Sequence, residues 1–204
     1  MSKLYARFGT MKSSKSANLL MVAKNYELQN KEIITLTSET DNRNGVGFIT
    51  TRAGIEKRQC DAVIGKDDSV IEIVEKILTE KFPKTISCIL VDECQFLSQN
   101  HIQELAKLVD WVNIPVICYG LKIDFKGRLF DGSKRLIELA DSIEEIKNTC
   151  QFCNKKATMN LRTVNNIGTD SGEQIQIGDT EYHPVCREHY FGLINVDVST
   201  FLWK

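Results

Sequence analysis

Up to residue 146, apolar positions alternate between short strand-like runs and stretches with helical spacing. Runs rich in β-branched and apolar residues predict strands at residues 4–8, 32–37, 61–64, 88–91 and 115–120, and residues 142–146 are the last segment that fits this pattern. The clearest amphipathic helix follows a predicted N-cap at residues 67–69 and carries Val70, Ile73, Val74, Ile77 and Leu78.

Two further helices are predicted, one behind the first strand and one starting at Ser98. His101 falls on the second of these, and we expect it at the helix surface. Alternating strands and helices predict an α/β fold, with a mainly parallel sheet and helices on both faces. Ligands of such folds bind at the carboxyl ends of the strands, where Gly9–Ser16, Asp92-Glu93 and Gly120-Leu121 all fall.

The pattern changes near Cys150, where a polar, hairpin-like region between two cysteine-containing motifs begins. We therefore expect a nucleotide-binding α/β domain at residues 1–148, a small metal-binding domain at 149–192 and a tail at 193–204. The tail carries no functional signal.

A candidate phosphate-binding loop lies between the first strand and the first helix, with the sequence Gly9-Thr10-Met11-Lys12-Ser13-Ser14-Lys15-Ser16. Backbone N–H groups and a helix N-terminus in this context bind an anion, with Lys15 on the β- and γ-phosphates and Ser16 on magnesium. The usual motif has Gly before the lysine, and here that residue is Ser14. If the position requires left-handed geometry, serine costs about 1–2 kcal/mol, whereas with helical angles it costs little.

Two carboxylates follow the apolar run at residues 88–91. Asp92 is the expected magnesium partner of Ser16. Adjacent residues at a strand end point to opposite sides, so Glu93 need not share the role of Asp92. A carboxylate beside the γ-phosphate either accepts a proton from an attacking hydroxyl, as in a kinase, or positions water, as in an ATPase. A solvated surface charge is the third interpretation of Glu93.

Two metal-ligand pairs, Cys150-x-x-Cys153 and Cys186-x-x-His189, lie about thirty residues apart. Three thiolates and one imidazole complete a closed tetrahedral zinc site, which is structural and not catalytic. A redox Cys-x-x-Cys is the alternative, but it would not need a second matching pair. His183 is a rival ligand to His189.

Other candidates lie on loops. Arg43, close to Asp41, could lie near the phosphates, although such charges are usually solvated. Phe125 and Phe130 lie on a polar loop after a strand, where aromatic side chains suggest a flat ligand or a lid.

The amino-acid composition limits the kinds of partner that the protein is expected to bind. A net charge of −1 argues against a nucleic-acid surface, and no segment has the pattern of a signal peptide or the length of a membrane span. Cys60, Cys88, Cys94 and Cys118 are scattered singly, which fits reduced thiols in a cytoplasmic protein.

The set of motifs resembles the type II thymidine kinases, the zinc-containing, cytosolic class. Besides the phosphate loop, the likeness rests on residues 41–43, 92–96, 120–125, 140–146, 150–153, 173–178 and 182–191, which occur in family order over nearly the whole chain. The resemblance implies a P-loop, RecA-like fold with a small zinc-binding lasso domain.

The resemblance also implies that the protein transfers the γ-phosphate of ATP to the 5′-hydroxyl of thymidine or deoxyuridine. This reaction would serve pyrimidine salvage, which supplies DNA synthesis. Glu93 would be the general base, and the ATP–Mg²⁺ site would comprise Gly9 to Ser16, Asp41, Arg43, Asp92 and Gln95. A lasso at residues 159–182 would cover the nucleoside, which would contact Phe125, Phe130, Gln174, Ile175, Gln176, Ile177, Gly178 and Tyr182.

Structural Zn²⁺ would be held by Cys150, Cys153, Cys186 and His189. The resemblance further implies a cytoplasmic homotetramer that dTTP inhibits and that binds neither nucleic acid nor membrane. One alternative is a RecA-like ATPase in which the zinc module binds a macromolecule. Another is a zinc-ribbon nucleic-acid binder whose nucleotide site has decayed at Ser14.

Overall fold

The computed structural model describes residues 1–40, 46–51, 56–81, 83–174 and 180–200. Its largest sheet has the strand order β5–β2–β6–β7–β1–β8, and every neighbouring pair is parallel. The strands are β1 (Leu4–Gly9), β2 (Glu32–Ser38), β5 (Ala62–Ile64), β6 (Ile86–Val91), β7 (Val116–Gly120) and β8 (Ser142–Ile146).

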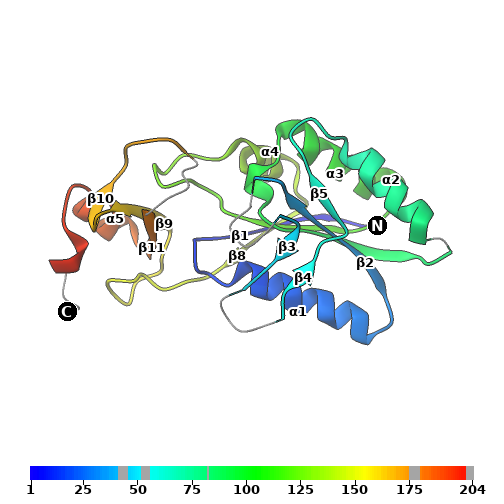
Figure 1. Ribbon diagram of the computed structural model, residues 1–204, viewed down its shortest axis with the longest axis horizontal. Helices are drawn as coiled ribbons and strands as arrows, with labels where there is room; N and C mark the ends of the chain where they lie inside the picture. The colour runs from blue at the N-terminus through cyan, green and yellow to red at the C-terminus, as the bar shows by residue number, and fades with distance from the viewer. Residues whose placement is uncertain (41–45, 52–55, 82, 175–179, 201–204) are drawn as a thin grey trace.

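Helices cover both faces of this sheet (Figure 1). One face carries α2 (Val70–Lys81), α3 (Gln99–Val112) and α4 (Asp131–Leu139), and the other carries α1 (Lys15–Leu28). A short hairpin of β3 (Phe48–Ile49) and β4 (Arg58–Gln59) lies on the α1 side, where Ile49 joins the core. The sheet has one apolar core on each face. Side chains alternate between these cores along β1, because Leu4, Ala6 and Phe8 face α2–α4 whereas Tyr5 packs on the α1 side.

A second, antiparallel sheet forms most of the C-terminal part, with the order β10–β9–β11. Its strands are β9 (Met159–Val164), β10 (Ile167–Thr169) and β11 (Thr180–Val185), and α5 (Arg187–Leu193) follows. This part has its own apolar core, which includes Phe152, Leu161 and Tyr190. Val198, from the short 3-10 turn η2 (Val198–Thr200), joins the same core.

The carboxyl ends of β1, β6 and β7 point toward this second sheet (Figure 1). Segments that follow those strands therefore face the C-terminal part. Tyr190 on α5 donates its hydroxyl to the carbonyl of Phe125 at 2.6 Å, which joins the two parts beside the end of β7. Within the described residues, none of the helices is both long and apolar enough to cross a membrane.

The predicted α/β architecture is confirmed, including the strands and the amphipathic helix at residues 70–81. Ser69 caps that helix as expected, since its hydroxyl accepts the N–H of Glu72 at 3.3 Å. The helix α4 was not predicted, because its sequence begins with Asp131, Gly132 and Ser133, which are typical of a loop. Gly132 is required there by close packing: a Cβ would lie 2.4 Å from the carbonyl oxygen of Leu97.

The expected surface position of His101 is wrong. Its side chain is buried, and its Nδ1 accepts the N–H of Ser98 at 3.3 Å while the Ser98 hydroxyl accepts the N–H of His101 at 3.1 Å. This reciprocal pair is a capping box at the start of α3. The second ring nitrogen lies 3.1 Å from the carbonyl oxygen of Asp68, which ties α3 to the segment before α2.

Candidate active site at the carboxyl edge of the sheet

The phosphate loop lies between β1 and α1, as the sequence predicts, and α1 begins at Lys15. Gly9 allows the loop to close tightly, because a Cβ there would lie 2.3 Å from Ser13 Oγ and 2.9 Å from the carbonyl oxygen of Ile146. α1 begins directly after this loop, and the N-terminus of a helix favours an anion.

Ser14 has left-handed backbone angles, with φ +64° and ψ +29°. This geometry is the costly case for a serine, since a side chain with a Cβ in this region costs about 1–2 kcal/mol. Lys12, two residues earlier, also has a positive φ of +60°. Alternating left-handed residues of this kind turn successive N–H groups to one side and form a concave anion site.

Two polar side chains of the loop fit a bound triphosphate. The ammonium group of Lys15 is buried and donates to the carbonyl of Thr10 at 2.9 Å. Ser13 Oγ is also buried and has no hydrogen-bond partner among the described residues. A buried hydroxyl without a partner costs free energy unless a ligand supplies one. The loop therefore offers a cation and an unsatisfied donor to phosphate oxygens.

Asp92 follows β6 and reaches the start of α1. Its carboxylate accepts the Ser16 hydroxyl at 2.9 Å, and the side chain is only 4% exposed. Burial, together with the neighbouring charge of Glu93, raises the pKa of Asp92 to about 7. A buried carboxylate and a hydroxyl are hard oxygen ligands of the kind that Mg²⁺ binds. A divalent cation at this pair would favour the ionised form that burial opposes.

Glu93 lies directly after Asp92 in a left-handed conformation, with φ +50°. Its carboxylate accepts a short hydrogen bond from the side-chain amide of Gln95. The amide oxygen of Gln95 in turn accepts the N–H of Leu121, after β7, at 2.9 Å. Gln95 therefore orients the Glu93 carboxylate, a role that the sequence did not indicate. Non-glycine residues with positive φ are frequently found at active sites.

Two pairs of aromatic side chains involve the segments that follow β6 and β7. Phe130 packs edge-on against Phe96, with ring centroids 6.0 Å apart, and Phe125 packs against Tyr182 at 6.5 Å. Both Phe125 and Phe130 are buried. Gln174 donates to Asp124 at 2.9 Å. The structure thus places Tyr182 and Gln174 of the C-terminal part beside the segment that follows β7.

Arg162 is a residue of this region that the sequence analysis did not identify. It is buried, its guanidinium group lies 4.3 Å from the ring centroid of Phe125, and it donates to the carbonyl of Glu173 at 3.2 Å. An arginine stacked on an aromatic face in a dry environment makes a strong cation–π contact. No local signal indicates it: in the sequence of β9 Arg162 alternates with apolar residues as a solvent-facing charge would, whereas the structure buries all of residues 160–163.

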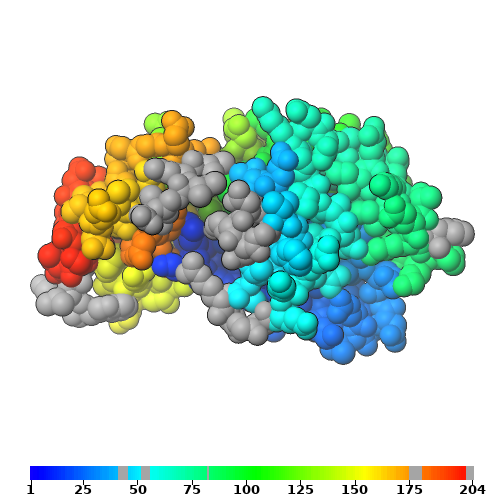
Figure 2. Space-filling model, in the orientation of Figure 1, coloured from blue at the N-terminus to red at the C-terminus, as the bar shows by residue number. Residues whose placement is uncertain are grey.

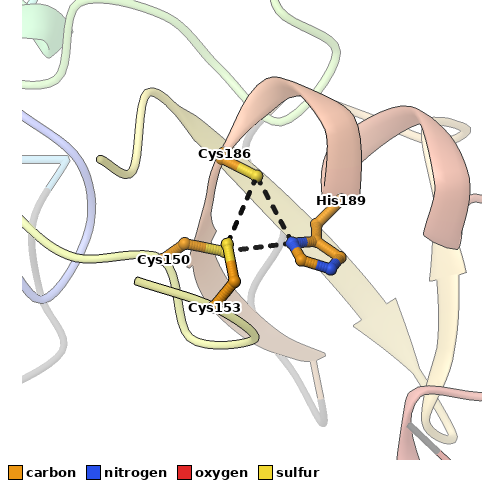
Figure 3. A group of neighbouring side chains, drawn as sticks. All are labelled: Cys150, Cys153, Cys186 and His189. Atoms are coloured by element: carbon orange, nitrogen blue, oxygen red, sulfur yellow. Dashed lines mark hydrogen bonds between the residues drawn. The ribbon is translucent and has the colours of Figure 1, made fainter. Parts of the chain in front are cut away.

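The predicted zinc ligands meet in one cluster (Figure 3). His189 Nδ1 lies 3.4 Å from Cys150 Sγ and 3.3 Å from Cys186 Sγ, and the thiols of Cys153 and Cys186 are 3.9 Å apart. A tetrahedral zinc with bonds of about 2.3 Å to sulfur places its thiolates about 3.8 Å apart. The donor set and its spacing therefore fit Zn²⁺.

His183 lies outside this cluster. Its Nδ1 lies 3.0 Å from Gln151 Oε1 and its Nε2 lies 3.1 Å from Thr163 Oγ1. Burial and then the charge of Lys12 lower the pKa of His183, so the neutral ring is favoured. Its two nitrogens are occupied by neighbouring side chains, which leaves His189 as the imidazole of the cluster.

Some predicted site residues lie outside the described residues, namely Asp41, Arg43, Ile175, Gln176, Ile177 and Gly178. The remaining ones lie in the phosphate loop, after β6 and β7, and in the C-terminal part. Figure 2 shows the surface hollowed between the α/β part and the C-terminal part, with the N-terminal segment, in blue, at the floor.

Comparisons with known proteins agree with this geometry. A family model described as thymidine kinase matches residues 2–190. A thymidine kinase of Streptococcus gordonii is 50% identical over 192 residues, which are 94% of this chain and 97% of that protein. Thymidine kinases of Lactiplantibacillus plantarum and Lactococcus lactis are 48% and 46% identical over the same length, covering 96% and 98% of those proteins.

The left-handed angles of Ser14 generate a first prediction. Ser14→Gly should raise the free energy of unfolding by about 0.5–1 kcal/mol, because glycine removes the Cβ penalty but loses more entropy on folding. ATP should bind equally well or more tightly, with thymidine affinity unchanged. Urea unfolding and calorimetric titration measure both. Ser14→Ala keeps the Cβ, so equal stabilisation by alanine would contradict this explanation.

Proposed function

The chain belongs to the thymidine kinase family, and we propose on this basis that it transfers the γ-phosphate of ATP to the 5′-hydroxyl of thymidine. It is thus an ATP-dependent phosphotransferase that acts on an alcohol group of a small molecule, and its products would be dTMP and ADP. The observation that supports the assignment to this site is that Glu93 directly follows Asp92, whose carboxylate contacts Ser16 of the phosphate loop, and is held by Gln95.

In the proposed donor site, the loop from Gly9 to Ser16 wraps the phosphates of ATP. Lys15 would move from the Thr10 carbonyl to the β- and γ-phosphates, and Ser13 would donate its unpaired hydroxyl. Asp92 and Ser16 would hold Mg²⁺. When bound, the metal neutralises charge on the phosphate oxygens. The resemblance to the family adds Asp41 and Arg43 to this site.

Glu93 is the proposed general base. As the 5′-oxygen attacks the γ-phosphorus, the hydroxyl proton passes to the Glu93 carboxylate and the bond between the γ-phosphorus and the bridging oxygen breaks, with ADP as the leaving group. Gln95, which the sequence grouped with the ATP ligands, holds this carboxylate through its amide. We therefore assign Gln95 the orientation of the base.

The acceptor would lie against aromatic side chains of two pairs, Phe130 with Phe96 and Phe125 with Tyr182, and we call these four residues the aromatic cluster. The family resemblance adds backbone contacts from Gln174 to Gly178 on a lasso at residues 159–182, and extends the substrates to deoxyuridine. A covering segment excludes water and so favours transfer to an alcohol over hydrolysis.

The Cys150, Cys153, Cys186 and His189 cluster would hold a structural Zn²⁺. Because the protein supplies four ligands, it leaves no open position for substrate or water. The metal would join the loop before β9 to the start of α5 and so stabilise the second sheet. We propose that the chain comprises an α/β domain at residues 1–148, a zinc-binding domain at 149–192 and a tail at 193–204.

The remaining proposals concern assembly and regulation. We propose that the protein is a cytoplasmic homotetramer and that dTTP inhibits it. We propose further that it acts on small molecules and not on nucleic acid or membranes.

Exposed apolar side chains support self-association: Met21 and Leu28 on α1, and Ile143 on the edge strand β8. The thymine and deoxyribose of dTTP match the acceptor site, and its triphosphate matches the donor loop. The free cysteines support a reducing compartment.

A product assay tests the function. Incubation with γ-labelled ATP, Mg²⁺ and a panel of nucleosides should transfer label to thymidine and deoxyuridine only, with the monophosphate identified by chromatography. ATP hydrolysis that is independent of nucleoside would favour the ATPase alternative. An inert protein that binds DNA or RNA would favour the nucleic-acid binder.

The substitution Glu93→Gln tests the role of Glu93 as the general base. The amide cannot accept the proton, so kcat should fall by about 10²–10⁴-fold while the fold and ATP binding are retained. Steady-state kinetics and the circular dichroism spectrum measure the two effects. Glu75→Gln makes the same chemical change on the exposed side of α2 and should leave kcat unaltered. Near-normal turnover of Glu93→Gln would exclude Glu93 as the base.

Metal content tests the cysteine–histidine cluster. The purified protein should carry about one zinc ion per chain, as one four-ligand site requires. Cys153→Ser should reduce that content and expose the second sheet to protease, because the sheet then loses a crosslink. Cys60→Ser, which changes a cysteine outside the cluster, should retain the metal. Folded wild-type protein without zinc would refute the site.

A further inference from the structure

Two asparagine side chains from the C-terminal half of the chain contact the phosphate loop. Asn160 Oδ1 accepts the N–H of Met11 at 2.8 Å. Asn148 Nδ2 lies 3.3 Å from both the Met11 carbonyl oxygen and the Thr10 hydroxyl. The N–H and the carbonyl of Met11 are thus both held by side-chain amides that lie far away in the sequence.

The bond from Asn160 acts on one particular peptide unit. The N–H of Met11 and the carbonyl of Thr10 belong to the same planar group and point in opposite directions. That carbonyl accepts the Lys15 ammonium at 2.9 Å and the Ser13 N–H at 3.3 Å. Asn160 therefore holds, from the far side, the peptide whose carbonyl contacts the phosphate-binding lysine. If this peptide rotated, the contact between the Thr10 carbonyl and the Ser13 N–H would be lost, and this contact closes the loop wherever Lys15 points.

Asn160 is itself fixed by its surroundings. It lies on β9, where it is paired with Pro184 of β11, and its side chain is 3% exposed. Its amide nitrogen also donates to the carbonyl of Ile123, in the segment after β7, at 3.3 Å. One buried amide thus connects the second sheet, the phosphate loop and the segment that carries the aromatic cluster.

We propose that Asn160 is a positioning residue for phosphate transfer, which orients the Thr10–Met11 peptide so that the loop keeps its phosphate-binding shape. Asn148 supports the same segment from its other side. The inference rests on the proposed function, because the loop must bind ATP for its shape to matter. It assigns to the second sheet a contribution to the donor site in addition to covering the acceptor.

A cavity of about 270 Å³ borders this contact and is lined by residues that include Gly9, Thr10 and Asn160. When the side chain is shortened, water from this space can reach the Met11 N–H. The variant should therefore fold, while water, being mobile, would not fix the peptide orientation. We expect roughly a tenfold rise in the KM for ATP, the size of effect that corresponds to one lost hydrogen bond to a partly buried donor.

The test compares Asn160→Ala and Asn160→Ser with Asn100→Ala, which makes the same chemical change at an exposed position of α3. Each protein is examined with its metal bound, by steady-state kinetics in both substrates and by hydrogen exchange of the Met11 amide without nucleotide. Asn160→Ala should raise the KM for ATP about tenfold, leave the KM for thymidine within about twofold, and speed Met11 exchange at least tenfold. Asn160→Ser retains an acceptor oxygen and should recover part of both effects, while Asn100→Ala should match the wild type.

Other outcomes would overturn the inference. A rise in the KM for thymidine with that for ATP unchanged would make Asn160 a residue of the acceptor site. Unchanged Met11 exchange in Asn160→Ala would show that the peptide is held without it. A wild-type protein that fails to phosphorylate any nucleoside would refute the proposed function, and the exchange measurement would still show whether Asn160 orders the loop.

Discussion

The proposed active site depends on a carboxylate that is buried directly after the central strand β6. Water is excluded from Asp92, and Glu93 adds a second negative charge beside it, so the ionised form is disfavoured in the protein alone. The Ser16 hydroxyl compensates part of this cost. Such an arrangement is poor for stability and suited to binding a cation, which is the pattern expected where a protein places charge for function.

Backbone strain is concentrated around the same carboxylate. Ser14 and Glu93 both have left-handed angles without being glycine; Glu93 directly follows Asp92, and Ser14 lies two residues before Ser16, whose hydroxyl Asp92 accepts. Close packing maintains these conformations: Gly9 and Gly120 allow approaches that any side chain would block. A Cβ on Gly120 would lie 2.6 Å from Gln95 Oε1, the atom that fixes the amide holding Glu93. The glycines therefore determine where the strained residues point.

The second sheet completes the site through a few polar contacts with the α/β part. Tyr190 holds the segment after β7, Arg162 stacks on Phe125, and Asn160 reaches the phosphate loop. Arg162 and Asn160 both lie on β9 and Tyr190 lies on α5, and the cysteine–histidine cluster brings the segment before β9 together with the start of α5. A rigid connection of this kind lets a small metal-binding unit influence both halves of a two-substrate site.

Sequence patterns by themselves determined the parallel α/β architecture, the phosphate loop, the Asp92-Glu93 pair and the metal-ligand set, because each depends on local spacing or on residue type. Helix α4, the burial of His101 and the tie from Asn160 to Met11 came only from the tertiary structure. Asn160 and Met11 are 149 positions apart, and nothing in either segment indicates that they meet. Local spacing specifies which side chains lie at the end of a strand. Packing between segments that are distant in the sequence decides which of those side chains touch and how each one is oriented.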